Sequence, residues 1–198
     1  GAVGSWGIGI ALVWDCLCCR VVEVRYARVA VTFPYIPGLL SFREEPILRA
    51  AMDRLRQRVD VWIFDGQGVC HPRGVGLATH LGIGLGMPTV GAAKSVLLGG
   101  IMPTAARAVD GSRVAPVRWH QADVAQALWA PDAKTPVIVS QGFMCTLEQA
   151  TALVRLCTRE GQWLPEPTRL ADAWTKRVRN LTPAAARRLV EARGATPD

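Results

Sequence analysis

Long apolar runs are missing from this 198-residue chain. No uninterrupted apolar stretch reaches the roughly 18–20 residues that a membrane-spanning helix needs, so we expect no contact with membranes. The apolar opening, Gly1–Leu12, also lacks the basic flank and the cleavage site of a signal peptide. We interpret this opening as a strand that starts a sheet, in a protein of the cytoplasm.

Several short signatures are missing as well. No two Cys-x-x-Cys elements face each other among the six cysteines, which argues against a structural zinc site. Three cysteines crowd one turn between strands (Cys16, Cys18 and Cys19), and three are scattered (Cys70, Cys145 and Cys157). We expect all six to be reduced, as in cytoplasmic proteins. No Gly-x-Gly-x-x-Gly follows a strand and no phosphate-loop lysine is present, which excludes the common dinucleotide and nucleoside triphosphate sites.

Positive charge and apolar residues are abundant. The net charge is +7, which favours an anionic partner, nucleic acid first, although a merely basic domain is the alternative. Many cations lie in the C-terminal third: Lys176, Arg177, Arg179, Arg187, Arg188 and Arg193. Half of the residues are apolar and seven are tryptophan, so either the core is large or apolar surface is left for a protein partner.

Residue patterns predict a mixed α/β sheet with helices on its faces, in a single domain that spans residues 1–198. Three strands are expected first, at Ile8–Trp14, Arg20–Tyr26 and Arg28–Phe33. Helices are expected at Phe42–Arg56, within Gly74–Gly86, and at Leu147–Cys157, Thr168–Arg177 and Pro183–Arg193. The remaining strands are expected at Val59–Phe64, Thr89–Ala92, Ala125–Ala130 and Pro136–Ser140, with Gly99–Pro116 as a loop.

Two carboxylates stand where chemistry is plausible. Asp65 ends an apolar strand and begins the turn Gly66-Gln67-Gly68, a place where side chains face a cleft. Glu44 opens the helix that follows the third strand. Taken singly, Glu44 could be a favourable charge at a helix N-terminus and Asp65 a turn cap. Metal-assisted hydrolysis of phosphodiesters needs carboxylates of this kind from different elements.

Longer motifs give these residues a context. Pro34-Tyr35-Ile36-Pro37 precedes Glu44, and His71-Pro72-Arg73 follows Asp65. Further along are Gly76–Gly82, Gly91-Ala92-Ala93-Lys94, Ser140-Gln141-Gly142 and Leu164–Asp172. In this order the motifs resemble endonuclease V, the family that nicks strands next to deaminated adenine (inosine or deoxyinosine). The resemblance covers most of the chain and implies an RNase H-like fold.

The resemblance also implies roles. Tyr35, held by Pro37, matches the aromatic wedge that inserts beside the damaged base. Lys94 matches a lysine near the scissile phosphate, and Glu44 and Asp65 match ligands of Mg²⁺. The pocket for a flipped base matches Gly66, Gly68, His71 and His80.

Two positions depart from the family pattern. The family's first strand carries a metal-binding Asp where this chain has Val3, unless that Asp lies upstream of Gly1, since the chain begins without a methionine. The family places a His after Ser-x-Gly where this chain has Phe143, which cannot ligate a metal or transfer a proton. His71, His80 and His120 are the histidines that could substitute. His71 and His80 are better explained as hydrogen-bonded pocket or structural residues, and His120 lies in loop-like sequence with no carboxylate pattern nearby.

We therefore predict a chain that has lost efficient nuclease activity and serves as a binding or accessory subunit in a heteromeric complex with another protein. The alternative is an active, Mg²⁺-dependent endonuclease that nicks DNA or RNA next to deoxyinosine or inosine, as in DNA repair. A third hypothesis is a cysteine-dependent enzyme that uses Cys70 beside His71, or Cys145.

Overall fold

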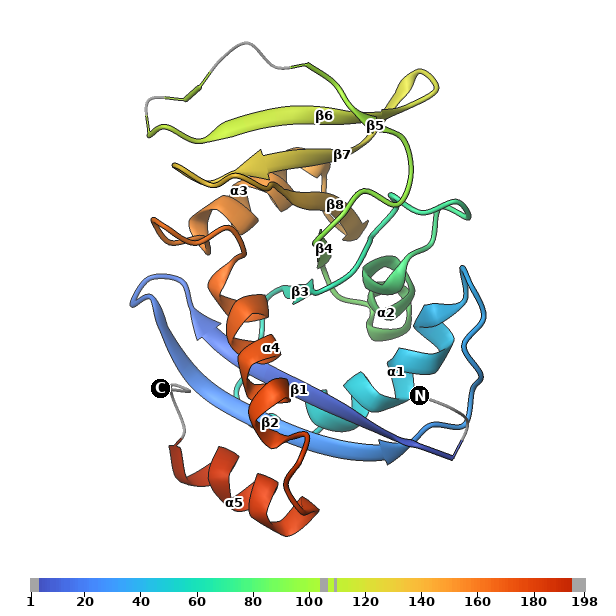
Figure 1. The fold of residues 1–198 in the computed structure, drawn as a ribbon, viewed down its shortest axis with the longest axis vertical. Coiled ribbons are helices and arrows are strands. Elements are labelled where there is room, and N and C mark those ends of the chain that lie inside the picture. Colours follow the sequence, from blue (N-terminus) through green and yellow to red (C-terminus); the bar gives the residue numbers. More distant parts are fainter. Residues whose placement is uncertain (1–3, 104–106, 109, 194–198) are drawn as a thin grey trace. The chain divides into compact units, whose positions relative to one another are not determined.

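Two compact units make up the chain in this computed structural model, which describes residues 4–103, 107–108 and 110–193. We call Gly1–Val59 with Arg169–Asp198 the hairpin unit, and Asp60–Thr168 the sheet unit. Figure 1 shows the strands and helices of each unit. The prediction of a single domain stays a prediction, and each unit is described by itself.

The hairpin unit is built on two long antiparallel strands, β1 (Trp6–Asp15) and β2 (Arg20–Ala30). Their pairing runs from Trp6↔Ala30 to Asp15↔Arg20. The predicted third strand at Arg28–Phe33 is therefore wrong, because β2 continues through Tyr26 and Ala27 to Ala30. The sequence between Tyr26 and Arg28 contains no Gly, Pro, Asn or Asp, so nothing there turns the chain.

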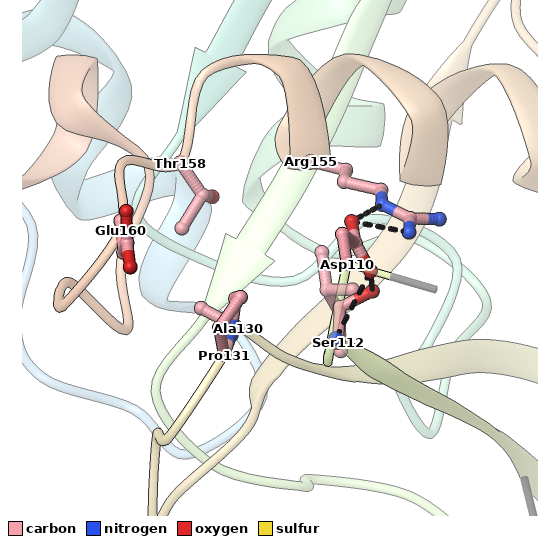
Figure 2. A pocket seen from close by; sticks show the side chains of 8 residues that line it. Asp110, Ser112, Ala130, Pro131, Arg155, Thr158 and Glu160 are labelled. Atoms are coloured by element: carbon pink, nitrogen blue, oxygen red, sulfur yellow. Dashed lines mark hydrogen bonds and ion pairs between the residues drawn. The ribbon is translucent and has the colours of Figure 1, made fainter. Parts of the chain in front are cut away.

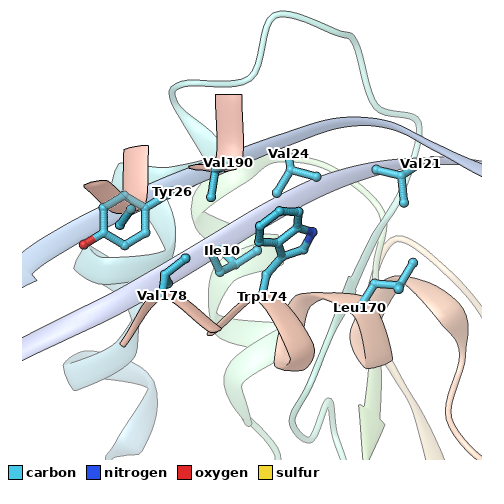
Figure 3. Close-up of a cluster of buried hydrophobic side chains, with 9 residues drawn as sticks. Ile10, Val21, Val24, Tyr26, Leu170, Trp174, Val178 and Val190 are labelled. Atoms are coloured by element: carbon cyan, nitrogen blue, oxygen red, sulfur yellow. The ribbon is translucent and has the colours of Figure 1, made fainter. Parts of the chain in front are cut away.

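Helices cover both faces of this hairpin. Side chains alternate along a strand, so Gly9 and Ile10 point to opposite faces. A side chain on Gly9 would overlap the carbonyl oxygen of Ile47 in α1 (Leu40–Met52), which places α1 against that face. On the other face Ile10 belongs to a buried cluster around Trp174, a fully buried residue of α4 (Glu166–Val178). Figure 3 shows this cluster, which also contains Val21, Val24, Tyr26, Leu170, Val178, Ala186 and, from α5 (Pro183–Arg193), Val190.

The sheet unit contains a six-stranded sheet in the order β3-β4-β8-β7-β6-β5. Its strands are β3 (Trp62–Phe64), β4 (Thr89–Ala93), β5 (Gly100–Ile101), β6 (Arg113–Trp119), β7 (Ala122–Trp129) and β8 (Val137–Phe143). β3 and β4 are parallel and the other pairs are antiparallel, so the sheet is mixed.

The predicted loop at Gly99–Pro116 is wrong in part, because β5 and most of β6 lie inside it. Proline and glycine in this stretch favoured a loop. However, Ala115 and Val117 are fully buried and alternate with Pro116, which follows the period of a strand. Met102 N–H donates to the carbonyl of Pro116, so the proline accepts a ladder hydrogen bond while donating none.

Helices also flank the large sheet. Val90 and Val139 face α3 (Leu147–Leu156), whose Ala150 and Val154 are fully buried against them. On the opposite face the hydroxyl of Thr89 donates to the carbonyl of Ala78 in α2 (Leu77–Leu85) at 2.7 Å. The predicted α/β class, a mixed sheet flanked by helices, is confirmed. Within the described residues, none of the helices combines the length and the apolar character that crossing a membrane requires.

Candidate active site

Asp65 stands at the carboxyl end of the parallel pair β3–β4. It follows Phe64, which pairs with Gly91, and the chain of β4 ends at Ala93, just before Lys94. Parallel strands bring the residues after their carboxyl ends to the same edge of a sheet, and this edge is where open α/β sheets hold ligands. The parallel pairing of β3 with β4 therefore brings Asp65 and Lys94 together.

The loop after Asp65 is fixed tightly over the sheet. The N–H of Gly68 donates to the hydroxyl of Ser140 on β8 at 2.7 Å, and Val69 N–H donates to the carbonyl of Gln141 at 2.8 Å. A Cβ on Gly68 would overlap that same carbonyl oxygen of Gln141, so only glycine fits. The backbone of this loop is thus held by β8, and it carries Asp65 at its start.

The carboxylate of Asp65 has one oxygen engaged by protein. Oδ2 accepts a hydrogen bond from Lys94 Nζ at 2.7 Å, and both side chains are about 40% exposed. Oδ1 has no hydrogen-bond donor among the described residues. An exposed ion pair of this kind contributes little to stability, on the order of 0–1 kcal/mol. One carboxylate oxygen is therefore available to a ligand or a hard cation.

A second carboxylate of the sheet unit gives a contrast. Asp110 lines a pocket of about 320 Å³ beside Arg155, and Figure 2 shows both with Ser112. Its Oδ1 accepts from the N–H and the hydroxyl of Ser112, at 3.0 and 2.7 Å, and its Oδ2 accepts from Nε and Nη2 of Arg155, at 3.1 and 2.5 Å. These donors, Arg155 first, hold the pKa of the Asp110 carboxyl well below its usual range. Sequence reasoning missed this pocket, because Asp110 and Arg155 are 45 positions apart and belong to no motif.

The residues predicted to line a base pocket occupy the loop and helix after Asp65. His71 is buried, its Nδ1 accepts from the N–H of Arg73 at 3.2 Å, and burial together with Arg73 lowers its pKa. A neutral, hydrogen-bonded His71 fits the predicted structural role. His80 lies on α2, one turn after Gly76, and its N–H donates to the Gly76 carbonyl at 2.9 Å.

Gln67 is a polar residue of this loop to which the sequence assigned no role of its own. Its side chain is 8% exposed, and its Nε2 donates to the carbonyl of Ser95 at 2.8 Å. Its Oε1 is buried and has no hydrogen-bond partner among the described residues. The contact with Ser95 joins the loop of Asp65 to the segment that carries Lys94.

In the hairpin unit, Tyr35 stands on an exposed loop with rigid ends. The N–H of Leu39 donates to the carbonyl of Ile36 at 2.9 Å across Pro37 and Gly38, and Gly38 has φ 77°. Proline at the second position and a left-handed glycine at the third are typical of a type II turn. Tyr35 is 66% exposed, which suits a side chain that stacks on a base.

The base of this loop is closed by an aromatic pair. The rings of Phe33 and Phe42 stack with centroids 5.9 Å apart, and Arg43 Nη1 donates to the carbonyl of Phe33 at 2.8 Å. Phe33 precedes the loop and Phe42 lies in α1, so the loop is held where it leaves β2 and where it enters the helix. The predicted wedge therefore has a rigid support.

Glu44 lies on α1 but does not open it. The helix begins at Leu40, two residues before the predicted start at Phe42, so Glu44 is in its second turn and the first turn holds no acid. The charge effect of a helix N-terminus falls off within the first turn. A favourable charge at the helix start therefore does not explain Glu44, and its role as a metal ligand stays a prediction.

Comparison with known proteins decides the family. A sequence model described as Endonuclease V matches residues 3–173. The chain belongs to the endonuclease V family. The endonuclease V of Gloeobacter violaceus is 44% identical over 160 residues, which are 81% of this chain and 64% of that protein. This chain thus spans less than two thirds of that relative's length.

Solved endonuclease V structures share the fold. The Bacillus subtilis protein gives a TM-score of 0.80 at 29% identity, covering 88% of this chain and 73% of that one. The Ciona intestinalis protein, at 22% identity, gives a TM-score of 0.68 and covers 87% of this chain and 83% of that one. The Ciona structure is a complex with a 24mer DNA containing an inosine followed by a ribo-adenosine.

The two positions that depart from the endonuclease V pattern have different outcomes. Val3 lies outside the described residues. Phe143 is the last residue of β8 and pairs with Thr89, which pairs with Trp62, whereas Asp65 directly follows β3 and lies three residues beyond Trp62. At about 3.3 Å per residue, the row of Phe143 is roughly 10 Å from Asp65 along the strands. The structure does not bring Phe143 to the carboxyl end of β3.

The cysteines near this endonuclease V loop show no nucleophilic arrangement. Cys70 is fully buried, its Sγ donates to the carbonyl of Leu98 at 3.5 Å, and burial raises its pKa. A thiolate is therefore disfavoured there. Cys145 donates to the carbonyl of Thr89 at 3.1 Å. Neither contact orients a cysteine toward His71, so the geometry does not favour the third hypothesis.

The donor chemistry of Asp65 fits a hard cation. Mg²⁺ prefers carboxylate oxygens and keeps several waters, so one exposed carboxylate oxygen is a suitable ligand. Among the described residues no three His, Cys, Asp or Glu side chains gather closely enough to hold a metal ion. Asp65 would therefore share the ion with water and with ligands from other segments of an endonuclease V.

Proposed function

We propose that this chain nicks nucleic-acid strands next to inosine, with Asp65 and Glu44 as ligands of Mg²⁺. The observation that carries the proposal is the half-exposed Asp65 carboxylate after β3, which has one oxygen on Lys94 and the other without a donor from the part of the chain that the structure describes. Membership of the endonuclease V family and the inosine-containing DNA bound by the Ciona relative support the choice of substrate. A cytoplasmic location stays part of the proposal.

Each residue has a defined task in this proposal. Mg²⁺ would activate a water and stabilise charge on the scissile phosphate. Lys94 presents an ammonium group beside Asp65, where it neutralises a phosphate oxygen. Tyr35 stacks on a base, which is worth roughly 1–3 kcal/mol. The net charge of +7 attracts the strand.

A second candidate is a subunit that binds nucleic acid or another protein without cutting. Phe143 favours it, because a phenylalanine, which pairs with Thr89 and whose Cβ lies close to Gly82, stands where the resemblance expects a histidine. Exposed tryptophans also favour a protein interface: Trp6 is 59% exposed and Trp119 46% exposed, whereas Trp174 is buried. The guanidinium carbon of Arg28 lies 5.3 Å from the centre of the Trp6 ring, so this tryptophan already has a contact within the chain and is weaker support for an interface.

A nicking assay separates the two candidates. A labelled strand with one inosine is incubated with protein and Mg²⁺, beside the same strand with adenine. We expect nicking of the inosine strand only, and Asp65→Asn should slow it by about 10²-fold or more. Asp110→Asn is the matched control, because that carboxylate is saturated by Ser112 and Arg155, and it should leave the rate unchanged.

Matched variants in the hairpin unit extend the assay. Glu44→Gln should slow nicking, whereas Glu45→Gln, which weakens an ion pair with Arg49 at 3.5 Å within the same helix, should not. Binding is measured separately by anisotropy without Mg²⁺, and Tyr35→Ala should weaken it about 5- to 150-fold. Binding of inosine strands without nicking would select the second candidate. Absence of both activities would reject nucleic acid as the partner.

A further inference from the structure

The tip of the hairpin carries three cysteines that the proposed nuclease chemistry does not use. The last rung of the ladder is Asp15↔Arg20, and the four residues Cys16–Cys19 form the connecting turn. The Asp15 carboxylate accepts from the N–H of Leu17 at 2.9 Å and from that of Cys18 at 3.0 Å. Cys19 has φ 48°. Four-residue hairpin loops are most often built around a type I turn, so this is an ordered loop.

The first and last residues of this turn are close. Cys16 directly follows Asp15 and Cys19 directly precedes Arg20, the two residues of the final rung, and the Cα atoms at the ends of a β-turn lie within about 7 Å. A disulfide needs roughly 4.4–6.8 Å between Cα atoms. Cys19 Sγ already lies 3.5 Å from the carbonyl oxygen of Cys16, to which it donates. We propose that Cys16 and Cys19 form a reversible disulfide across the hairpin tip, with glutathione disulfide as the oxidant.

The third cysteine is excluded by its contacts. The Cys18 thiol donates to the Asp15 carboxylate, and this bond raises the pKa of Cys18, so its nucleophilic thiolate is disfavoured. Cys18 and Cys19 are neighbours with Cα atoms about 3.8 Å apart, less than a disulfide usually spans. A closed zinc site is not built either, because the described residues contain no group of three metal-ligating side chains. A disulfide needs only two sulfurs.

The reaction balances in two exchange steps. The thiolate of the exposed Cys19 attacks glutathione disulfide, the glutathione S–S bond breaks, and one glutathione leaves as a mixed disulfide forms. The thiolate of Cys16 then attacks Sγ of Cys19 and releases the second glutathione. Two electrons pass from the two protein thiols to the oxidant, and their two protons end on the released glutathione thiols.

The test is a thiol map across glutathione redox ratios. Native protein is equilibrated with glutathione disulfide and glutathione, quenched in acid, unfolded in denaturant so that buried thiols also react, alkylated, digested and analysed by mass spectrometry. We expect two of the six thiols to escape alkylation, in one peptide that links Cys16 to Cys19. Buried Cys70 and Cys157 should remain thiols and serve as internal controls. Oxidation should raise Tm by on the order of 3 °C.

Single variants decide which sulfurs react. Cys18→Ser should still form the link and show the rise in Tm, whereas Cys19→Ser and Cys16→Ser should lose both. A link that involves Cys18, a stable glutathione adduct on Cys19, or a disulfide between two chains would overturn the proposal. So would full alkylation of Cys16 and Cys19 at every redox ratio. All these positions lie in an exposed or half-exposed turn, so the variants should fold.

Discussion

Asp65 and Asp110 each form an ion pair with a basic side chain of the sheet unit, Lys94 and Arg155, but the two carboxylates differ in how many protein donors surround them. The side chains have similar exposure, 40% for Asp65 and 49% for Asp110. From the described residues, Asp110 accepts four hydrogen bonds, two on each oxygen, whereas Asp65 accepts one. Asp65 also starts a loop whose Gly68 packs against the backbone of β8. Asp110 lies in the segment just before β6, which begins at Arg113. The two carboxylates are therefore similarly exposed, but Asp65 has more lone pairs available to a ligand than Asp110.

This difference separates a structural carboxylate from a reactive one. A carboxylate has about four lone-pair sites. At Asp110 protein donors occupy them, so the group contributes to the order of the loop and has little left for a ligand. At Asp65 the geometry leaves an oxygen open at the end of a strand, where a cation or phosphate can approach. An ion pair alone would not have distinguished the two.

The largest effect is expected from a substitution that separates the loop after Asp65 from β8. Gly68→Ala puts a methyl group onto the carbonyl oxygen of Gln141, a backbone atom that cannot move without β8. We expect a loss of roughly 3 kcal/mol in the free energy of unfolding, measured by urea denaturation, and loss of nicking. The hydrogen bonds of Asp110 with Ser112 and Arg155 should be unaffected.

Gly100→Ala is the matched control for this change, since a Cβ there meets nothing within 4 Å. It should leave stability within about 0.5 kcal/mol of the parent protein. A Gly68→Ala variant as stable as Gly100→Ala would mean that the loop after Asp65 is not held by β8, and the contrast with Asp110 would lose its basis.

The sequence was sufficient for Asp65 and insufficient for Asp110, for physical reasons. Asp65 and Lys94 each follow a predicted strand and lie in motifs of the endonuclease V resemblance, while the parallel pairing that joins them is visible only in the structure. The contact of Asp110 with Arg155 depends on how α3 packs over β7 and β8, which no local pattern encodes. The same limit applies to β2, whose continuation to Ala30 could not be separated from a new strand by β propensity alone.

A smaller effect is expected from the loss of a serine hydroxyl. Ser140 bonds to the loop after Asp65, and Ser112 bonds to Asp110. Ser140→Ala leaves the buried N–H of Gly68 without its acceptor, which should cost about 1–3 kcal/mol. Ser112→Ala removes a hydroxyl from Asp110, but the N–H of Ser112 and both Arg155 bonds remain, so about 0.5–1 kcal/mol is expected. Urea denaturation of both variants measures the order. Equal losses would show that the two loops are held equally firmly.

The smallest effect is the pH dependence of the Asp110 pair. The folded state holds the pKa of Asp110 below its ordinary value of 3.8, so the folded protein binds fewer protons there than the unfolded chain. Its stabilising contribution is complete above about pH 5 and is lost as the pH falls below 3.8 toward the lowered pKa.

Thermal unfolding of the parent protein and of Asp110→Asn between pH 7 and pH 2 measures this contribution. The difference in Tm should be small at neutral pH, because the pair is exposed and screened by salt, and it should shrink in acid. A constant difference down to pH 2 would mean that Asp110 acts through its shape and hydrogen bonds rather than through its charge. The contacts of Asp110 with Ser112 and Arg155 would then act as neutral hydrogen bonds, and Asp110 would differ from Asp65 only in its number of hydrogen-bond donors.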